Sequence, residues 1–298
     1  MSAATGFVYD DAALREDLLN IMTNISPKNT QLVSGLGTST ASSIRHEWLI
    51  KTLNAVKTNA YVEGVDASYG ALTNPTRIVN YTQIAREGFE VTDTERSVNT
   101  AAFADRYQQE ATDALAELKN DMEFAILRGS MASGTGSAAR QCRGIKRSLS
   151  LVTSQSGVSL SEAILNDYLQ NVWDNTSTEV NAVYGDMYIK RKISGFTSGT
   201  TKNLDANDKR LVNSVDVYQA DAASNVKLFP HRYMTISGTD TNHDVLGINE
   251  DMFKVAYLRK PFTRELAKTG DSTKGEIVTE FTLQNDHYNA GFLGQAHL

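Results

Sequence analysis

The chain has 298 residues, of which 41% are hydrophobic and 21% are charged, and 29 Lys and Arg against 35 Asp and Glu give a formal net charge of −6. This composition is typical of a globular chain with a sizeable core, and the length favours about two domains. The negative charge argues against tight DNA binding, which needs a basic surface that neutralises phosphates. The single cysteine, Cys142, excludes an intrachain disulfide and a multi-thiolate metal site.

The sequence predicts neither a membrane-spanning helix nor a secretion signal. Its apolar runs, such as residues 124–127, are far shorter than the ~20 residues that span a bilayer. A signal peptide begins with basic residues, whereas residues 1–20 carry mainly Asp and Glu among their charged side chains. We therefore expect the protein to stay in the cytoplasm.

Residues 1–30 are predicted to form an arm followed by a short helix. Apolar side chains recur there at helical spacing until Ser26 and Pro27 end the run: Leu14, Leu18, Met22 and Ile25. Residues 31–41 are rich in Gly, Ser and Thr, which predicts a flexible connector.

Residues 44–91 predict a long hairpin. Ile44, His46, Trp48 and Ile50 recur at every second position, as in a half-buried strand. A second β-branched and aromatic run occupies residues 77–91. Between the two, residues 56–75 are rich in Ala, Asn, Gly, Ser and Thr, which predicts a mobile tip. A lone two-stranded ribbon is marginal in water, so the hairpin needs a surface of its own subunit or of a neighbour.

A long amphipathic helix is predicted from about Asn99 to Arg128. At 1.5 Å per residue it is about 45 Å long, too long for a small domain to bury. Ser97 or Asn99 is expected to cap its start, and Gly129 to end it in a left-handed conformation. The acidic residues between Asp105 and Glu123 are expected on a solvated face. The apolar stripe comprises Phe103, Tyr107, Ala111, Leu115, Leu118, Met122 and Ile126.

The second half predicts a linker over residues 129–137, then helices and strands. Ser159 and Glu162 have the spacing of a capping box before a helix, and residues 186–196 predict another short helix with Lys190, Arg191 and Lys192 exposed. Strands are expected over residues 211–218, 226–229, 233–237 and 276–283, the last returning to a shared sheet. A basic cluster after the linker either contacts phosphates or is a solvated or interface patch: Arg140, Arg143, Lys146 and Arg147.

Two motifs imitate ligand-binding loops. Gly134, Gly136 and Ala139 match dinucleotide-fingerprint spacing, but they follow a helix instead of a strand, and a flexible linker is the preferred interpretation. Asp240, Asn242 and Asp244 resemble the start of a calcium loop, but Val245 stands where the sharp turn needs glycine.

No constellation that performs chemistry is recognisable. The histidines form no HExxH pair, and the sequence contains no GxSxG elbow and no P-loop. Cys142 lies beside Arg140 and Arg143 without a nearby histidine, so we interpret it as a structural thiol. We therefore predict no catalytic, cofactor-binding or metal-binding residues and no enzyme activity. The long hairpin and the long helix cannot bury their own surfaces, which predicts that the protein assembles with other subunits.

Short segments along nearly the whole chain resemble the major capsid proteins of tailed bacteriophages with the Hong Kong 97 (HK97-like) fold, an α+β fold. No single motif is diagnostic, but their order is. In the first half they are residues 17–21, 24–27, 46–48, 63–64, 74–77 and 80–83, and in the second half residues 190–196, 205–216, 256–259 and 266–271.

This resemblance implies four parts and a structural role. An N-terminal arm covers residues 1–37 and an extended loop, the E-loop hairpin, residues 38–96. A peripheral domain with a spine helix covers residues 97–149 and 251–298, and an axial domain residues 150–250. The implied function is to build an icosahedral shell from hexamers and pentamers around packaged double-stranded DNA, which is contacted non-specifically. The candidate inter-subunit contacts are Trp48, Lys57, Glu63, Arg77 and Tyr81.

The implied partners are further copies of the chain, a scaffolding protein, a portal and a decoration protein, with no membrane and no cofactor. The implied location is the virion capsid, assembled in the host cytoplasm. Some relatives cross-link a Lys to an Asn, but no motif identifies a partner for Lys51 or Lys57. The short segment before the arm favours a separate scaffolding protein. Two alternatives remain: an encapsulin-like nanocompartment and, resting only on Gly134 to Ala139, a small soluble nucleotide-binding enzyme.

Overall fold

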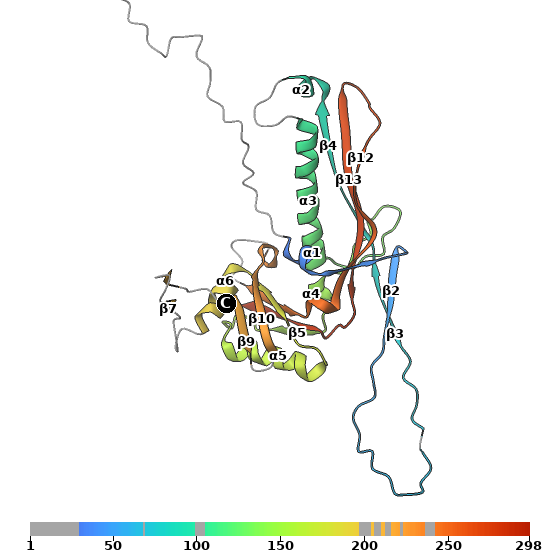
Figure 1. Cartoon of the computed structure of the whole chain (residues 1–298), viewed down its shortest axis with the longest axis vertical. Coiled ribbons are helices and arrows are strands. Elements are labelled where there is room, and N and C mark those ends of the chain that lie inside the picture. Colours follow the sequence, from blue (N-terminus) through green and yellow to red (C-terminus); the bar gives the residue numbers. More distant parts are fainter. Residues whose placement is uncertain are drawn as a thin grey trace, which may run out of the picture.

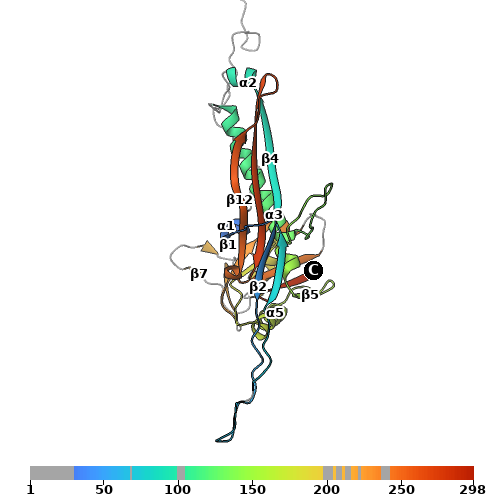
Figure 2. The same ribbon diagram turned by 90° about the vertical axis from the view of Figure 1, so that its right-hand side faces the viewer.

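The computed structural model describes residues 30–67, 69–98, 105–196, 204–205, 210–211, 216–220, 223–235 and 242–298. The predicted helix over residues 14–25 lies outside these residues. Figure 1 shows a long helix running beside long strands, with a more compact unit of helices and strands at one end. A thin loop projects beyond that end, and the turned view of Figure 2 shows how narrow the molecule is.

A four-stranded sheet forms the elongated part, in the order β1 (Gly37–Thr40), β12 (Phe253–Glu265), β13 (Ser272–Asn285) and β4 (Gln83–Thr92). β13 is antiparallel to both β12 and β4, whereas β1 is parallel to β12. A short helix, α2 (Asp93–Ser97), follows β4 at the far end. The predicted strand over residues 276–283 is therefore confirmed, within a longer strand.

The long helix α3 (Arg106–Arg128) packs along β4 and β13, as Figure 1 shows. Leu118, Met122 and Ile126 of the predicted stripe are buried, and Leu118 packs with Ile277 of β13. Asp105 caps the helix by accepting a hydrogen bond from the Tyr107 amide, so Ser97 is not its cap.

Gly129 ends α3 for a different reason from the one expected. Its φ is −48°, which is not left-handed. A Cβ at this position would lie 2.4 Å from the carbonyl oxygen of Cys142. Close approach of the returning chain therefore requires glycine here.

The predicted hairpin divides at Thr82. β2 (Arg45–Ile50) pairs with β3 (Thr76–Tyr81), with Arg45 opposite Tyr81 and Ile50 opposite Thr76. After Thr82, whose amide donates to the carbonyl of Ile44, the chain continues as β4 in the four-stranded sheet. The run over residues 77–91 is thus two strands with different partners. No strand pairing occurs among the described residues of 51–75.

A six-stranded sheet forms the compact unit. Its order is β5 (Leu151–Ser154), β14 (Gly291–His297), β11 (His243–Ile248), β6 (Ala182–Gly185), β10 (Ala223–Pro230) and β9 (Val217–Ala220). Helices α5 (Glu162–Asn175) and α6 (Met187–Phe196) pack on it through a second apolar core. β7 (Leu204–Asp205) and β8 (Arg210–Leu211) pair separately.

Each of the two sheets combines segments that the sequence predicts to belong to different parts of the chain. β1 and β4 lie in the four-stranded sheet, although residues 38–96 were grouped as the extended loop. β14 lies in the six-stranded sheet, although residues 251–298 were grouped with the spine helix. One apolar core joins both sheets to α3, with Phe281 of β13 and Leu293 of β14 among its buried members.

Three further local predictions are wrong. Residues 31–41 are not a flexible connector: they contain α1 (Gln31–Gly35), with Leu32 buried, and β1. Of the strand expected over residues 233–237, the described residues 233–235 are not a strand, because a 3-10 turn, η3 (Arg232–Met234), presents two carbonyls to Arg128. Ser161, not Ser159, caps α5, accepting from the amide of Ile164. The remaining short helices are α4 (Ile145–Ser148) and the 3-10 turn η4 (Glu250–Met252).

Candidate subunit interface

The projecting loop exposes many large apolar side chains. Leu53, Tyr69 and Leu72 are each at least 90% exposed. Contiguous exposed apolar surface marks an interaction site, because monomeric proteins rarely leave it uncovered. The small and polar residues that dominate the sequence of this tip hide the apolar ones between them. The exposed set on the loop is Leu53, Val56, Tyr61, Val62, Val65, Tyr69 and Leu72.

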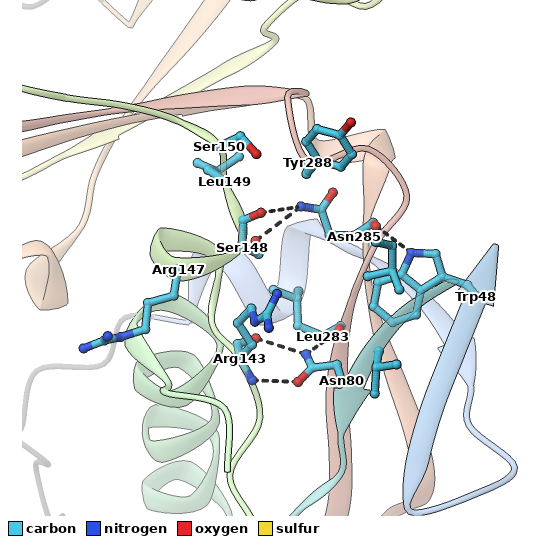
Figure 3. A pocket seen from close by; sticks show the side chains of 12 residues that line it. Trp48, Asn80, Arg143, Arg147, Ser148, Leu149, Ser150, Leu283, Asn285 and Tyr288 are labelled. Carbon is cyan, nitrogen blue, oxygen red and sulfur yellow. Dashed lines mark hydrogen bonds between the residues drawn. The ribbon is translucent and has the colours of Figure 1, made fainter. Parts of the chain in front are cut away.

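The base of the hairpin is fastened to its own subunit. The Trp48 indole Nε1 donates to the Asn285 carbonyl over 2.8 Å, and His46 Nε2 lies 3.2 Å from Oε1 of Gln284. Figure 3 shows buried Asn80 between two chain segments. Its Oδ1 accepts from the Arg143 amide over 2.7 Å, and its Nδ2 donates to the Leu283 carbonyl over 2.7 Å. The ribbon therefore has a fixed direction relative to β13.

A buried carboxylate, Glu280 of β13, ties the hairpin to the linker after α3. It pairs with Arg140 over 2.7 Å and with Arg259 over 3.1 Å, and accepts from the Thr82 hydroxyl over 2.8 Å. Lys146 likewise pairs with Asp244 over 2.5 Å, and burial lowers the pKa of Lys146. Two members of the predicted basic cluster are therefore internal.

Glu123 joins the short helix α1 to the spine helix. Its two carboxylate oxygens accept from the amides of Leu32 and Val33, each over 2.7 Å. Its Oε1 also lies 2.8 Å from Nε2 of His231, and both side chains are fully buried. Glu123 is thus not on the solvated helix face where its spacing placed it.

The five predicted contact residues lie in two places. Trp48 and Tyr81 are half-buried on the ribbon, and Arg77 there pairs with Glu47 over 3.2 Å while remaining largely exposed. Lys57 and Glu63 are exposed on the tip. The structure therefore does not bring the five together on one surface.

A cavity of about 320 Å³ lies between the ribbon, α4 and the end of β13. Figure 3 shows Trp48, Asn80, Arg143, Asn285 and Tyr288 around it. The other lining residues are Ile78, Val79, Arg147, Ser148, Leu149, Ser150 and Leu283. No acidic side chain of the described chain lines it. Sequence reasoning missed this cavity, because its walls come from three distant segments.

The described residues offer little for chemistry. Cys142 is fully buried, and burial raises the pKa of its thiol to about 12, so the reactive thiolate is scarce at neutral pH. Residues 134–139 form a turn in which the Thr135 amide donates to the Ala138 carbonyl, and the described part of the chain holds no cluster of three or more potential metal ligands. Within the same residues, no helix combines the length and apolarity that crossing a membrane requires.

Similar folds occur in solved shells. A structure from Gordonia phage Cozz aligns with a TM-score of 0.68 at 11% identity, covering 100% of this chain and 97% of that one. The capsid of a native GTA particle gives a TM-score of 0.68 at 9% identity, covering 99% and 100%. The holo-SrpI encapsulin complex from Synechococcus elongatus gives 0.59 at 10% identity, covering 98% and 95%. These likenesses define the class as proteins with the HK97-like α+β fold, as the sequence predicted.

The family follows from the sequence itself. The family model of the SU10 major capsid protein matches residues 2–294, and the chain belongs to this family. No curated protein matches the sequence. The chain is therefore a structural, shell-forming protein of the virion capsid that assembles with further copies of itself.

Proposed function

We propose that the chain forms the icosahedral head shell of a tailed phage, built from hexamers and pentamers around packaged double-stranded DNA. The observation that carries this proposal is the projecting loop (Figure 2), on which large apolar side chains such as Leu53, Val56 and Leu72 are at least 90% exposed. A surface that the subunit cannot bury stabilises contacts between subunits instead. The family's structural role and the inert environment of Cys142 support a protein without enzyme activity.

We further propose how the parts divide within the shell. The four-stranded sheet with α3 corresponds to the peripheral domain, which adds β1 and β4 to residues 97–149 and 251–298 but loses β14 to the axial domain. The six-stranded sheet with α5 and α6 corresponds to the axial domain, which adds β14 to residues 150–250. The arm covers residues 1–37, and the extended loop proper reduces to about residues 44–82. Lys57 and Glu63 contact a neighbour from the tip, and Trp48, Arg77 and Tyr81 from the ribbon.

The proposed partners are a separate scaffolding protein, a portal and a decoration protein, with assembly in the host cytoplasm. Expression of the chain alone and with its scaffolding protein, followed by sedimentation and negative-stain imaging, tests the shell. Closed particles are expected. Only monomers and dimers in both preparations would overturn the proposal.

An encapsulin-like compartment is the second candidate, favoured by the likeness to the holo-SrpI complex. The two functions differ in cargo. Particles purified from an infected or induced host should contain nuclease-protected double-stranded DNA if the chain forms a phage head. Particles that contain only protein cargo favour the compartment.

A further inference from the structure

The cavity beside the ribbon contains a cationic side chain for which no described residue supplies an anionic partner. Arg143 lines it, and the contact of its guanidinium within the described chain is to the sulfur of Met131, 3.3 Å from Nη2. No described carboxylate pairs with it. Its main chain is held on both sides by Asn80, whose amide accepts from the Arg143 N–H and donates to its carbonyl. Arg143 is half-buried as a residue and its main chain is fixed, and a guanidinium beside a cavity favours a carboxylate ligand.

The walls around Arg143 combine apolar and polar side chains. Trp48 and Ile78 come from the ribbon, and Leu283 comes from β13. Ser148 and Tyr288 add hydroxyl groups (Figure 3). The chemistry that fits is therefore a short peptide segment with an acidic side chain between apolar ones.

The tip of the extended loop has this chemistry. Val62 and Val65 are exposed, and the Val65 amide donates to the Val62 carbonyl over 3.4 Å, which closes a tight turn. Gly64 has a φ of +83°, the left-handed region that such a turn uses. Glu63 lies exposed in this turn, between the two valines, and Asp66 follows it.

We propose that the turn over residues 62–66 of one subunit inserts into this cavity on a neighbouring copy, where Glu63 pairs with Arg143. The proposal rests on the shell-forming function and names the receptor of its loop. The tip cannot reach the cavity of its own subunit, since the loop projects away from the ribbon base in both views (Figures 1 and 2). Tip and cavity are different surfaces of one chain, so the contact is heterologous and repeats head to tail, as in a closed ring.

Charge exchange tests the pairing. Glu63→Arg and Arg143→Glu are each expected to reduce particle yield by roughly tenfold or more, since each places like charges together at a desolvated contact. The chain that carries both substitutions restores the pair at every contact and should recover assembly. Lys51→Glu on the same loop and Lys119→Glu on α3, both exposed and outside the proposed contact, are the matched controls. Circular dichroism of each variant checks that the subunit folds.

The outcomes separate this inference from the shell function itself. Normal particles from Arg143→Glu or from Glu63→Arg would overturn the pairing, and so would a folded double variant that does not recover assembly. Neither result would contradict the proposed shell-forming function. A wild-type chain that forms no particles, even with scaffold, would instead overturn the proposed function.

Photo-crosslinking identifies the occupant directly. Dissociated Ser150→Cys subunits are labelled with a benzophenone maleimide, assembled and irradiated, and the products are mapped by mass spectrometry. Cys142 does not compete, because it is buried and protonated. Crosslinks to residues 61–66 of another copy are expected. Crosslinks only to residues 1–29 or to the scaffolding protein would overturn the proposal.

Discussion

His231 Nε2 lies 2.8 Å from the carboxylate of Glu123, and neither side chain is exposed to solvent. The Tyr233 amide donates to Nδ1 of the same imidazole over 3.3 Å, so Nε2 carries the hydrogen and donates it to Glu123. Two further donors, the amides of Leu32 and Val33, complete the carboxylate's environment. One side chain thus connects the spine helix, the start of the described chain and the turn that follows β10 in the compact unit.

We expect Glu123→Gln to lower the free energy of unfolding by about 1–3 kcal/mol. The amide has one acceptor oxygen where the carboxylate has two, so one of the three N–H donors loses its partner in a buried site. Urea unfolding of dissociated subunits measures the change. Glu117→Gln, at an exposed position of the same helix, should stay within about 0.5 kcal/mol of the parent. Equal stability of both variants would show that the Glu123 contacts do not stabilise the fold.

Leu118→Asp should destabilise the subunit by on the order of 4 kcal/mol, because it buries an unpaired carboxylate between α3 and β13. Lys119→Asp, one position along and exposed, serves as the control. Soluble yield and melting temperature report the difference. A Leu118→Asp melting curve that overlays the parent would mean that this helix face is not buried in solution.

The stability of the compact unit should fall in mild acid through His297. Burial lowers the pKa of this imidazole, whose two nitrogens contact the Val158 carbonyl and the Tyr168 hydroxyl. A lowered folded-state pKa contributes stability that is complete above the ordinary value of about 6.5 and is lost as the pH falls through the folded value. Thermal melts at pH 7.5 and 5 should therefore differ less in His297→Gln than in the parent. An unchanged difference would contradict the assignment.

The loop tip should be cut first when free subunits meet a protease. Residues 56–75 make few contacts with the rest of the chain, so local opening costs little free energy. In assembled particles a neighbour covers the same residues, and cleavage there should slow strongly. Mass spectrometry of timed digests locates the cuts. Equal protection before and after assembly would show that the tip packs on its own subunit.

Replacing residues 58–74 with a short glycine-containing turn should separate folding from assembly. The apolar core around Phe281 and Leu283 does not include the tip, so circular dichroism and thermal melting should match the parent. Shells should not form, because a contact worth even about 1–2 kcal/mol is lost at every copy in a symmetric particle. Normal particles would mean that the tip is dispensable, and unfolded aggregates that it belongs to the core.

Periodicity was enough to predict the spine helix and the strands at residues 45–50 and 276–283, because burial on one side imposes a repeat on the local sequence. It failed at Thr82. The chain is rich in β-branched and aromatic residues on both sides, and the break is set by two partners distant in sequence, β2 and β13. Glu123 was misplaced for the same reason, since its partners lie about 90 and 108 positions away.

Parts of the candidate interface can likewise be predicted from the sequence, and other parts cannot. Trp48 and Glu63 are contact candidates through the family resemblance of their segments, and their contact with a neighbour stays a prediction. The cavity could not, because Asn80, Arg143 and Asn285 meet only once the ribbon, the segment after α3 and the end of β13 are folded together. Charge patterning alone also does not distinguish Arg140, which is paired internally, from Arg143.

The fastening of the ribbon to β13 determines how the subunit carries mechanical load. Trp48, Asn80 and Thr82 all attach to residues 280–285 of that strand, so tension applied to the tip is delivered along its axis. The strand is bonded on both sides, to β4 and to β12, by hydrogen bonds that lie across the direction of pull. Such bonds are sheared together instead of being peeled one by one. In a shell under outward pressure, all the hydrogen bonds that join β13 to β4 and β12 would therefore resist the load together.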